Sequence, residues 1–96
     1  MRVEIDSEIK ELIPDFLDNR QSDIELVVTA IESKDFKTIE RIGHLMRGTC
    51  GGYGFDDLEK LGAELEKSAQ AQELESIKKQ LVYFKGFLQN LEIVYT

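Results

Sequence analysis

The sequence predicts an all-α protein, an antiparallel four-helix bundle with a short extra N-terminal helical segment. Apolar residues recur at steps of three and four along most of the chain, which is the spacing of one buried helix face. Proline is nearly absent, with only Pro14, and four of the seven glycines lie between Gly48 and Gly54. An all-β fold needs turn residues about every 8–12 positions, and this composition does not supply them.

The first two helical segments meet at Pro14. We expect a short segment from about Ser7, a restart at Pro14, and a long helix that ends near Ser33. Proline suits the first turn of a helix, where its missing N–H is not needed. The apolar positions that predict this long helix are Ile13, Phe16, Leu17, Ile24, Val27, Val28 and Ile31.

The second helix is predicted from Phe36 to about Tyr53. Asp35 is a suitable N-cap, because its carboxylate can accept hydrogen bonds from the free backbone N–H groups of the first turn. Gly54 is typical of a left-handed helix stop. The expected buried stripe comprises Phe36, Ile39, Ile42, Met46, Cys50 and Tyr53.

Two further helices complete the bundle. Asp56 and Glu59 resemble a capping box that opens the third helix, and the apolar pattern breaks around residues 70–72. Gly62 and Gly86 are expected to permit close packing between helices. The third helix should bury Leu58, Leu61, Leu65 and Ala69. The fourth carries Leu74, Ile77, Leu81, Phe84, Leu88, Leu91 and Tyr95, at the alternating spacing of a left-handed bundle. Short connections make neighbouring helices antiparallel.

Length, composition and charge limit the function. The chain has 96 residues, 42% of them apolar, so we expect one globular domain spanning residues 1–96. Nineteen acidic against twelve basic residues give a net charge of −7, which disfavours nucleic-acid binding. No apolar run is long enough to cross a membrane, and residues 1–10 lack the basic start and apolar stretch of a secretory signal, so we expect none. The single cysteine fits a reducing compartment, so we expect a cytoplasmic protein.

The only histidine, His44, lies off the apolar stripe of the second helix. At 100° per residue it falls about 140° from Ile39, whereas Met46 and Cys50 stay near Ile39. The other residues of this outer sector are basic or lack a side chain. They are Lys37, Arg41, Gly48 and Gly51, with Glu40 and Arg47 at the flanks of the sector. Residues 34–54 hold four basic and two acidic residues, so this acidic chain has a local positive surface suited to an anion or an acidic partner.

These residues carry a family resemblance. The run His44-Leu45-Met46-Arg47-Gly48-Thr49-Cys50, followed by Tyr53-Gly54-Phe55, resembles the signature of the histidine-containing phosphotransfer (HPt) domain. The resemblance extends over about residues 12–92, and the family fold is a four-helix bundle. Departures are mild, since Cys50 and Phe55 replace the usual alanine and Arg47 stands where lysine is common.

The resemblance implies that His44 accepts a phosphoryl group from an aspartyl phosphate on a receiver domain and passes it to another receiver. Arg47, one turn on, would neutralise charge on the phosphoryl oxygens. Gly48 and Gly51 would give access to the ring, and Lys37, Arg41 and Glu40 would lie in the docking surface. The receiver would supply the aspartate and Mg²⁺, so the chain would be a phosphoryl carrier with no cofactor of its own and not an enzyme.

Other interpretations stay open. The same glycine-lined face could serve a helical adaptor that binds a receiver or kinase without being phosphorylated, or a bundle that inhibits or dephosphorylates a receiver. Glu40, four residues before His44, could bond its ring or make only a surface contact. Cys50 and Met46 are expected in the core, which argues against redox or haem chemistry. We expect a monomer.

Overall fold

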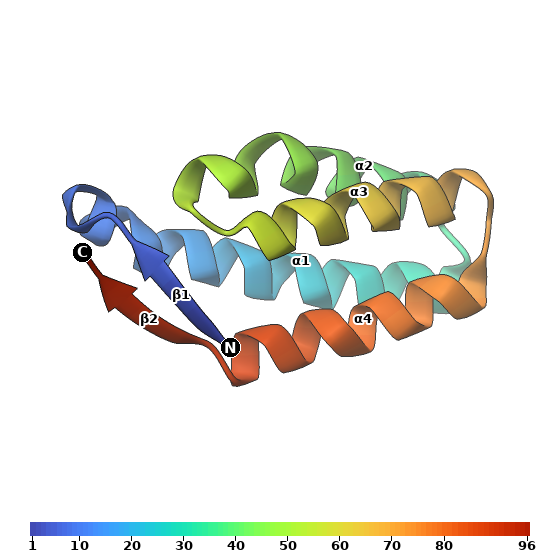
Figure 1. Ribbon diagram of the computed structural model, residues 1–96. Coiled ribbons are helices and arrows are strands. Elements are labelled where there is room, and N and C mark those ends of the chain that lie inside the picture. The colour runs from blue at the N-terminus through green and yellow to red at the C-terminus, as the bar shows by residue number, and fades with distance from the viewer.

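The computed structural model describes residues 1–96 and contains four helices that alternate in direction (Figure 1). The helices are α1 (Ile13–Ser33), α2 (Phe36–Thr49), α3 (Asp56–Gln70) and α4 (Leu74–Gln89). Nineteen buried apolar side chains form one core between them. The prediction of an all-α antiparallel bundle is therefore confirmed.

The N-terminal helical segment is also confirmed. Ser7–Leu12 forms a 3-10 helix, η1, which Asp6 caps by accepting a hydrogen bond from the N–H of Glu8 at 2.9 Å. α1 follows directly, with Pro14 in its first turn. It ends where Lys34 takes a left-handed conformation, with φ of 55°.

α2 begins as predicted but ends earlier. The carboxylate of Asp35 accepts hydrogen bonds from the Thr38 N–H and hydroxyl, at 3.2 and 2.6 Å, and these bonds lower the pKa of Asp35. The α-helix stops at Thr49, and Cys50–Tyr53 form a tighter 3-10 turn, η2. The glycines of that turn are poor α-helix formers, which explains the early end. Gly54 is left-handed, as predicted, with φ of 92°.

The predicted capping box before α3 is wrong. Phe55 occupies the N-cap position and makes no side-chain cap, while Asp56 is already the first helical residue. The reason is tertiary: the Phe55 ring is fully buried and stacks on Phe16, with ring centroids 4.9 Å apart. The carboxylates of the first turn still face the positive end of the helix dipole.

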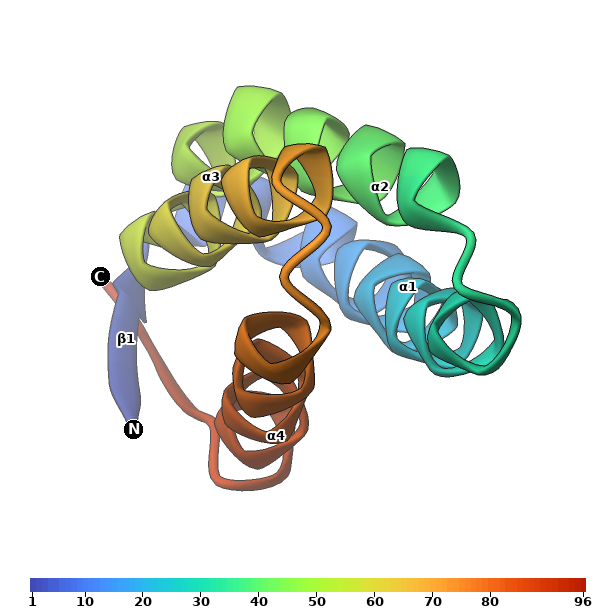
Figure 2. The ribbon, with the colours of Figure 1, turned by 90° about the vertical axis from the view of Figure 1, so that its right-hand side faces the viewer.

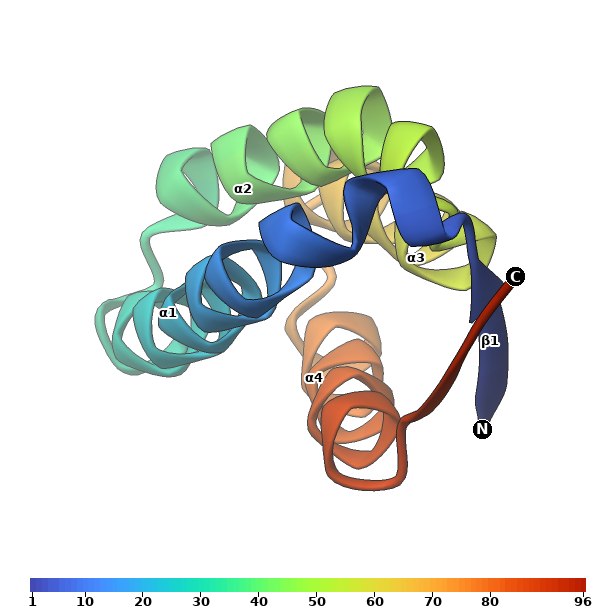
Figure 3. The ribbon, with the colours of Figure 1, turned by 90° about the vertical axis from the view of Figure 1, so that its left-hand side faces the viewer.

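The fourth helix ends at Gln89 and the last residues form a strand, so the helical assignments of Leu91 and Tyr95 are wrong. β2 (Glu92–Tyr95) pairs in parallel with β1 (Arg2–Ile5), with Val3 opposite Ile93. Figures 1 and 3 show both chain ends at the same end of the bundle. β-branched and aromatic residues suit a strand, and their partner lies some 90 residues away, beyond any local pattern.

α2 and α3 lie side by side in the bundle (Figure 2). Their backbones approach closely at two glycines, Gly43 and Gly62. A Cβ on Gly43 would lie 2.6 Å from the carbonyl oxygen of Gly62, and a Cβ on Gly62 would lie 2.7 Å from the backbone nitrogen of Arg47. The predicted role of Gly62 in close packing is thus confirmed. The same prediction for Gly86 is wrong, because no atom lies within 4 Å of a Cβ there.

None of the helices combines the length and the apolar character that a membrane-spanning segment needs.

Candidate functional site

His44 projects from the outer face of α2. Its side chain is 60% exposed, whereas Met46 and Ile42 on the same helix are buried. The side chain therefore points where the helical wheel places it, away from the core. Its Nε2 atom makes no hydrogen bond within the protein.

A carboxylate on the neighbouring helix holds the other ring nitrogen. Glu66 of α3 places Oε2 2.8 Å from Nδ1 of His44, and its Oε1 lies 3.0 Å from Nε of Arg47. The Glu66 side chain is only 16% exposed, while that of Arg47 is 50% exposed. One carboxylate thus fixes both the imidazole and the guanidinium.

This contact determines the tautomer of His44. A carboxylate is an acceptor only, so a 2.8 Å approach to Nδ1 requires a proton on that nitrogen. In the neutral ring the lone pair then resides on Nε2. Arg47 Nη2 lies 3.2 Å from Nδ1, beside a nitrogen that already donates to Glu66. The exposed Nε2 is therefore the ring nitrogen that is left without a partner in the protein.

Glu66 was not among the candidates that the sequence suggests. It reaches His44 because Gly43 and Gly62 let the two backbones approach, and these glycines stand one residue before His44 and four before Glu66. The available signal was an acidic residue one turn after a core-facing glycine, at the edge of the α3 apolar stripe. That signal specifies no partner until the crossing of the helices is known.

Glu40 does not bond to the His44 ring. Its Oε2 instead accepts a hydrogen bond from Nε2 of Gln70 at 3.0 Å, a partner that the sequence does not suggest. Glu40 still belongs to the site's surroundings, because a shallow surface hollow beside the ring is lined by Lys37, Glu40, Arg41, His44 and Glu66. Lys37 and Arg41, the two basic residues expected in the docking surface, share this hollow with the carboxylates of Glu40 and Glu66.

Gly48 and Gly51, which were both predicted to give access to the His44 ring, have different surroundings. A Cβ on Gly48 would meet no atom within 4 Å, so the helix surface one turn after His44 is bare. Gly51 instead lies in η2 and faces α3, where a Cβ would meet the carboxylate of Glu59. Only Gly48 therefore leaves space next to the ring. Leu45, 57% exposed, is the large apolar side chain that α2 presents beside it.

Cys50 and Met46 are core residues, as predicted. Both are fully buried, and burial raises the pKa of the Cys50 thiol. No group of three or more His, Cys, Asp or Glu side chains is arranged to hold a metal ion.

The chain is thus a four-helix bundle that carries one exposed histidine on its second helix. A family model described as the Hpt domain matches residues 11–93. Searches of curated proteins and of solved structures find no match. The chain belongs to the Hpt domain family, whose members carry out histidine phosphotransfer in two-component signalling.

Proposed function

We propose that His44 is the phosphoryl acceptor of a phosphorelay. The observation that carries the proposal is the pairing of Nδ1 with Glu66, which leaves an unpaired Nε2 on an exposed ring. The family supports a phosphoryl carrier, and His44 is the only histidine in the chain.

The transfer follows from this geometry. The Nε2 lone pair attacks the phosphorus of an aspartyl phosphate on a receiver domain. The N–P bond forms as the P–O bond to the aspartate breaks, and the aspartate leaves as a free carboxylate. The ring gains positive charge during the attack, and the Glu66 carboxylate on Nδ1–H stabilises it. Transfer to a second receiver is the reverse reaction with another aspartate.

Arg47 has two tasks in this proposal. Its Nε holds Glu66, and its exposed guanidinium lies near enough to the ring to face the oxygens of a phosphoryl group on Nε2. Charge-assisted hydrogen bonds to those oxygens stabilise the transferring group. The chain itself supplies positioning and charge, while the aspartate and Mg²⁺ belong to the receiver.

The receiver would dock over the His44 face. Gly48 leaves the approach to Nε2 open, Leu45 offers apolar contact, and Lys37 and Arg41 stand at the rim. A receiver's active site is acidic in this scheme, so the positive rim would speed association.

The test is transfer from a panel of receivers labelled with ³²P on aspartate. The wild-type chain should take up label that is lost in acid and kept in base, as expected of phosphohistidine. His44→Gln should take up none while keeping the wild-type circular dichroism and melting temperature.

A His44→Gln protein that is labelled as fully as wild type would contradict the assignment. Binding of a receiver to wild type and variant alike, without labelling of either, would instead indicate the adaptor function.

A further inference from the structure

A second candidate site lies on the side of α3 opposite His44. A cavity of about 430 Å³ opens between α3 and α4. α3 contributes Asp57, Lys60, Leu61 and Glu64, and α4 contributes Lys79, Gln80 and Tyr83. This volume lies within the range of small-ligand pockets.

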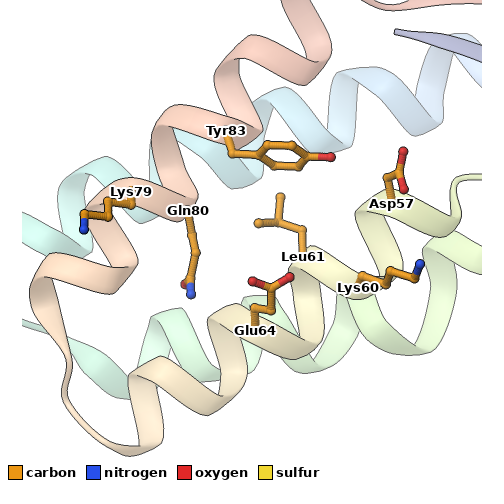
Figure 4. A pocket seen from close by; sticks show the side chains of 7 residues that line it. All are labelled: Asp57, Lys60, Leu61, Glu64, Lys79, Gln80 and Tyr83. Carbon is orange, nitrogen blue, oxygen red and sulfur yellow. The ribbon is translucent and has the colours of Figure 1, made fainter.

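The side chains that point into the cavity are an aromatic ring, a leucine, a carboxylate and an amide. Figure 4 shows the Tyr83 ring over Leu61, with the Glu64 carboxylate directed toward both. The ammonium groups of Lys60 and Lys79 are directed away from the centre. The interior is therefore apolar and negative, although two lysines stand at its edge.

The acceptors of this cavity lack partners. No basic side chain lies within 4.0 Å of the carboxylates of Asp57 or Glu64, since the ion pairs of the chain all lie elsewhere. The Oε1 atom of Gln80 is buried and makes no hydrogen bond, while its Nε2 donates to the Ser68 hydroxyl at 2.9 Å. The unpaired carboxylates of Asp57 and Glu64, and not this buried oxygen, are the acceptors open to a donor that enters the cavity.

The electrostatics point to a cation. Burial is the main cause that raises the pKa of the Tyr83 hydroxyl, and the nearby charges of Asp57 and Glu64 raise it further. A planar guanidinium matches all these features, because it stacks on an aromatic face, pairs with a carboxylate through two N–H groups and has further donors to spare.

We propose that the α3–α4 cavity binds a guanidinium group on an apolar stem, with its plane on Tyr83, its N–H groups on Glu64 and its stem on Leu61. The group could belong to a free small molecule or to an arginine of a partner protein, and the test distinguishes these two sources. The proposal does not depend on the function of His44. Glu66 and Gly62 face α2, whereas Leu61 and Glu64 face α4, so the two sites occupy opposite sides of α3.

The experiment is a titration of the full ¹⁵N-labelled chain, followed by amide shifts. The first probe is N-acetyl-arginine amide, and its control is N-acetyl-citrulline amide, which has the same shape and no charge. Arginine should shift the amides around Leu61, Glu64 and Gln80, and citrulline should bind at least fivefold more weakly. A six-residue peptide with one central arginine is the second probe. Binding at least tenfold tighter than N-acetyl-arginine amide supports a protein partner, and equal binding supports a small molecule.

Variants distinguish binding in the cavity from general attraction to the acidic surface of the protein. Glu64→Gln should weaken arginine binding at least fivefold. Glu25→Gln removes the same charge from the exposed face of α1 and should leave binding unchanged. Tyr83→Phe keeps the ring and should bind as wild type, whereas Tyr83→Leu should lose most of the affinity.

The proposal is overturned if citrulline binds as well as arginine, if the shifts spread over the acidic surface, or if Glu64→Gln and Glu25→Gln behave alike. Tyr83 is 45% exposed, and Glu64 and Glu25 are also exposed, so none of these variants should unfold the protein, and a melting curve for each checks this.

Discussion

Glu66 illustrates how one side chain organises the site. Its two carboxylate oxygens bind different partners, Nδ1 of His44 and Nε of Arg47, at 2.8 and 3.0 Å. Both partners are half-exposed or more, so without Glu66 each would rotate freely in solvent. The carboxylate thus restricts the ring orientation and the tautomer at the same time.

Glu66→Ala should slow phosphoryl transfer by about 10–100-fold, because a charge-assisted hydrogen bond is worth about 1.5–3 kcal/mol. The variant should also shift the His44 ring toward a mixture of tautomers, visible in the ¹⁵N shifts of Nδ1 and Nε2. Glu75→Ala is the matched control, because Glu75 is an exposed carboxylate on α4, outside the His44 face, and should affect neither readout. A Glu66→Ala ring that keeps its proton on Nδ1 would contradict this role.

Substitutions at Gly48 should change the access of a receiver to His44 without weakening the fold. A side chain there would point into open space, so Gly48→Ala should raise the free energy of unfolding by up to about 1 kcal/mol through helix propensity. Gly48→Gln should fold as well as wild type but obstruct the receiver and slow transfer sharply, and Gly48→Ala should do so mildly. Gly86→Gln, also in open space but on α4, is the control and should transfer at the wild-type rate. If Gly48→Gln transfers as fast as wild type, Gly48 has no access role.

At the scale of elements, the boundaries of α2 and the crossing of α2 with α3 decide the site. Asp35 fixes where α2 begins, and therefore which side chains face outward nine residues later at His44. The close contact at Gly43 and Gly62 then brings α3 near enough for Glu66 to reach the ring.

The Asp35 cap should make stability depend on pH. Its pKa in the folded state is lowered from 3.8, first by the Thr38 hydroxyl and then by the Thr38 backbone N–H. A lowered folded pKa means that the ionised cap stabilises the fold above pH 3.8 and that this stabilisation is lost as the pH falls through the folded pKa. Wild type should therefore exceed Asp35→Ala in urea midpoint at pH 7, and the difference should shrink in acid. A difference that is constant across this range would exclude the ionised cap.

Gly62→Ala should destabilise the protein by at least about 2 kcal/mol, because the new methyl group would meet the backbone of α2 at 2.7 Å. Where the variant still folds, α3 must move away from α2 and the contact between Glu66 and His44 should weaken. Urea denaturation measures the first effect and the His44 ¹⁵N shifts measure the second. Gly86→Ala should stabilise, which would show that the loss is specific to the helix crossing.

For the whole molecule, the two short strands join the ends of the chain to the bundle. Besides the parallel pairing of β1 and β2, the amino terminus donates to the Asn90 carbonyl, and the Ser7 hydroxyl donates to that of Thr96. Ile5 is 1% exposed and belongs to the same core as the helices. Ile5 therefore joins the first strand to the core of the bundle.

Ile5→Ala should lower the free energy of unfolding by about 2–5 kcal/mol, as expected for a truncated core side chain. Val82→Ala is the control, because Val82 is 71% exposed and should change stability by less than about 0.5 kcal/mol. A small effect of Ile5→Ala would show that the first strand lies outside the cooperative unit.

Local patterns in the sequence determined the four helices, the cap at Asp35, the stop at Gly54 and the outward direction of His44. Each depends on neighbours within a few residues, which periodicity and capping chemistry describe well. Tertiary structure decided the rest: the contact of Glu66 with His44, the start of α3 after the buried Phe55, and the pairing of β2 with β1. These contacts join residues from 22 to some 90 positions apart, and they form only when helices cross and the chain ends meet.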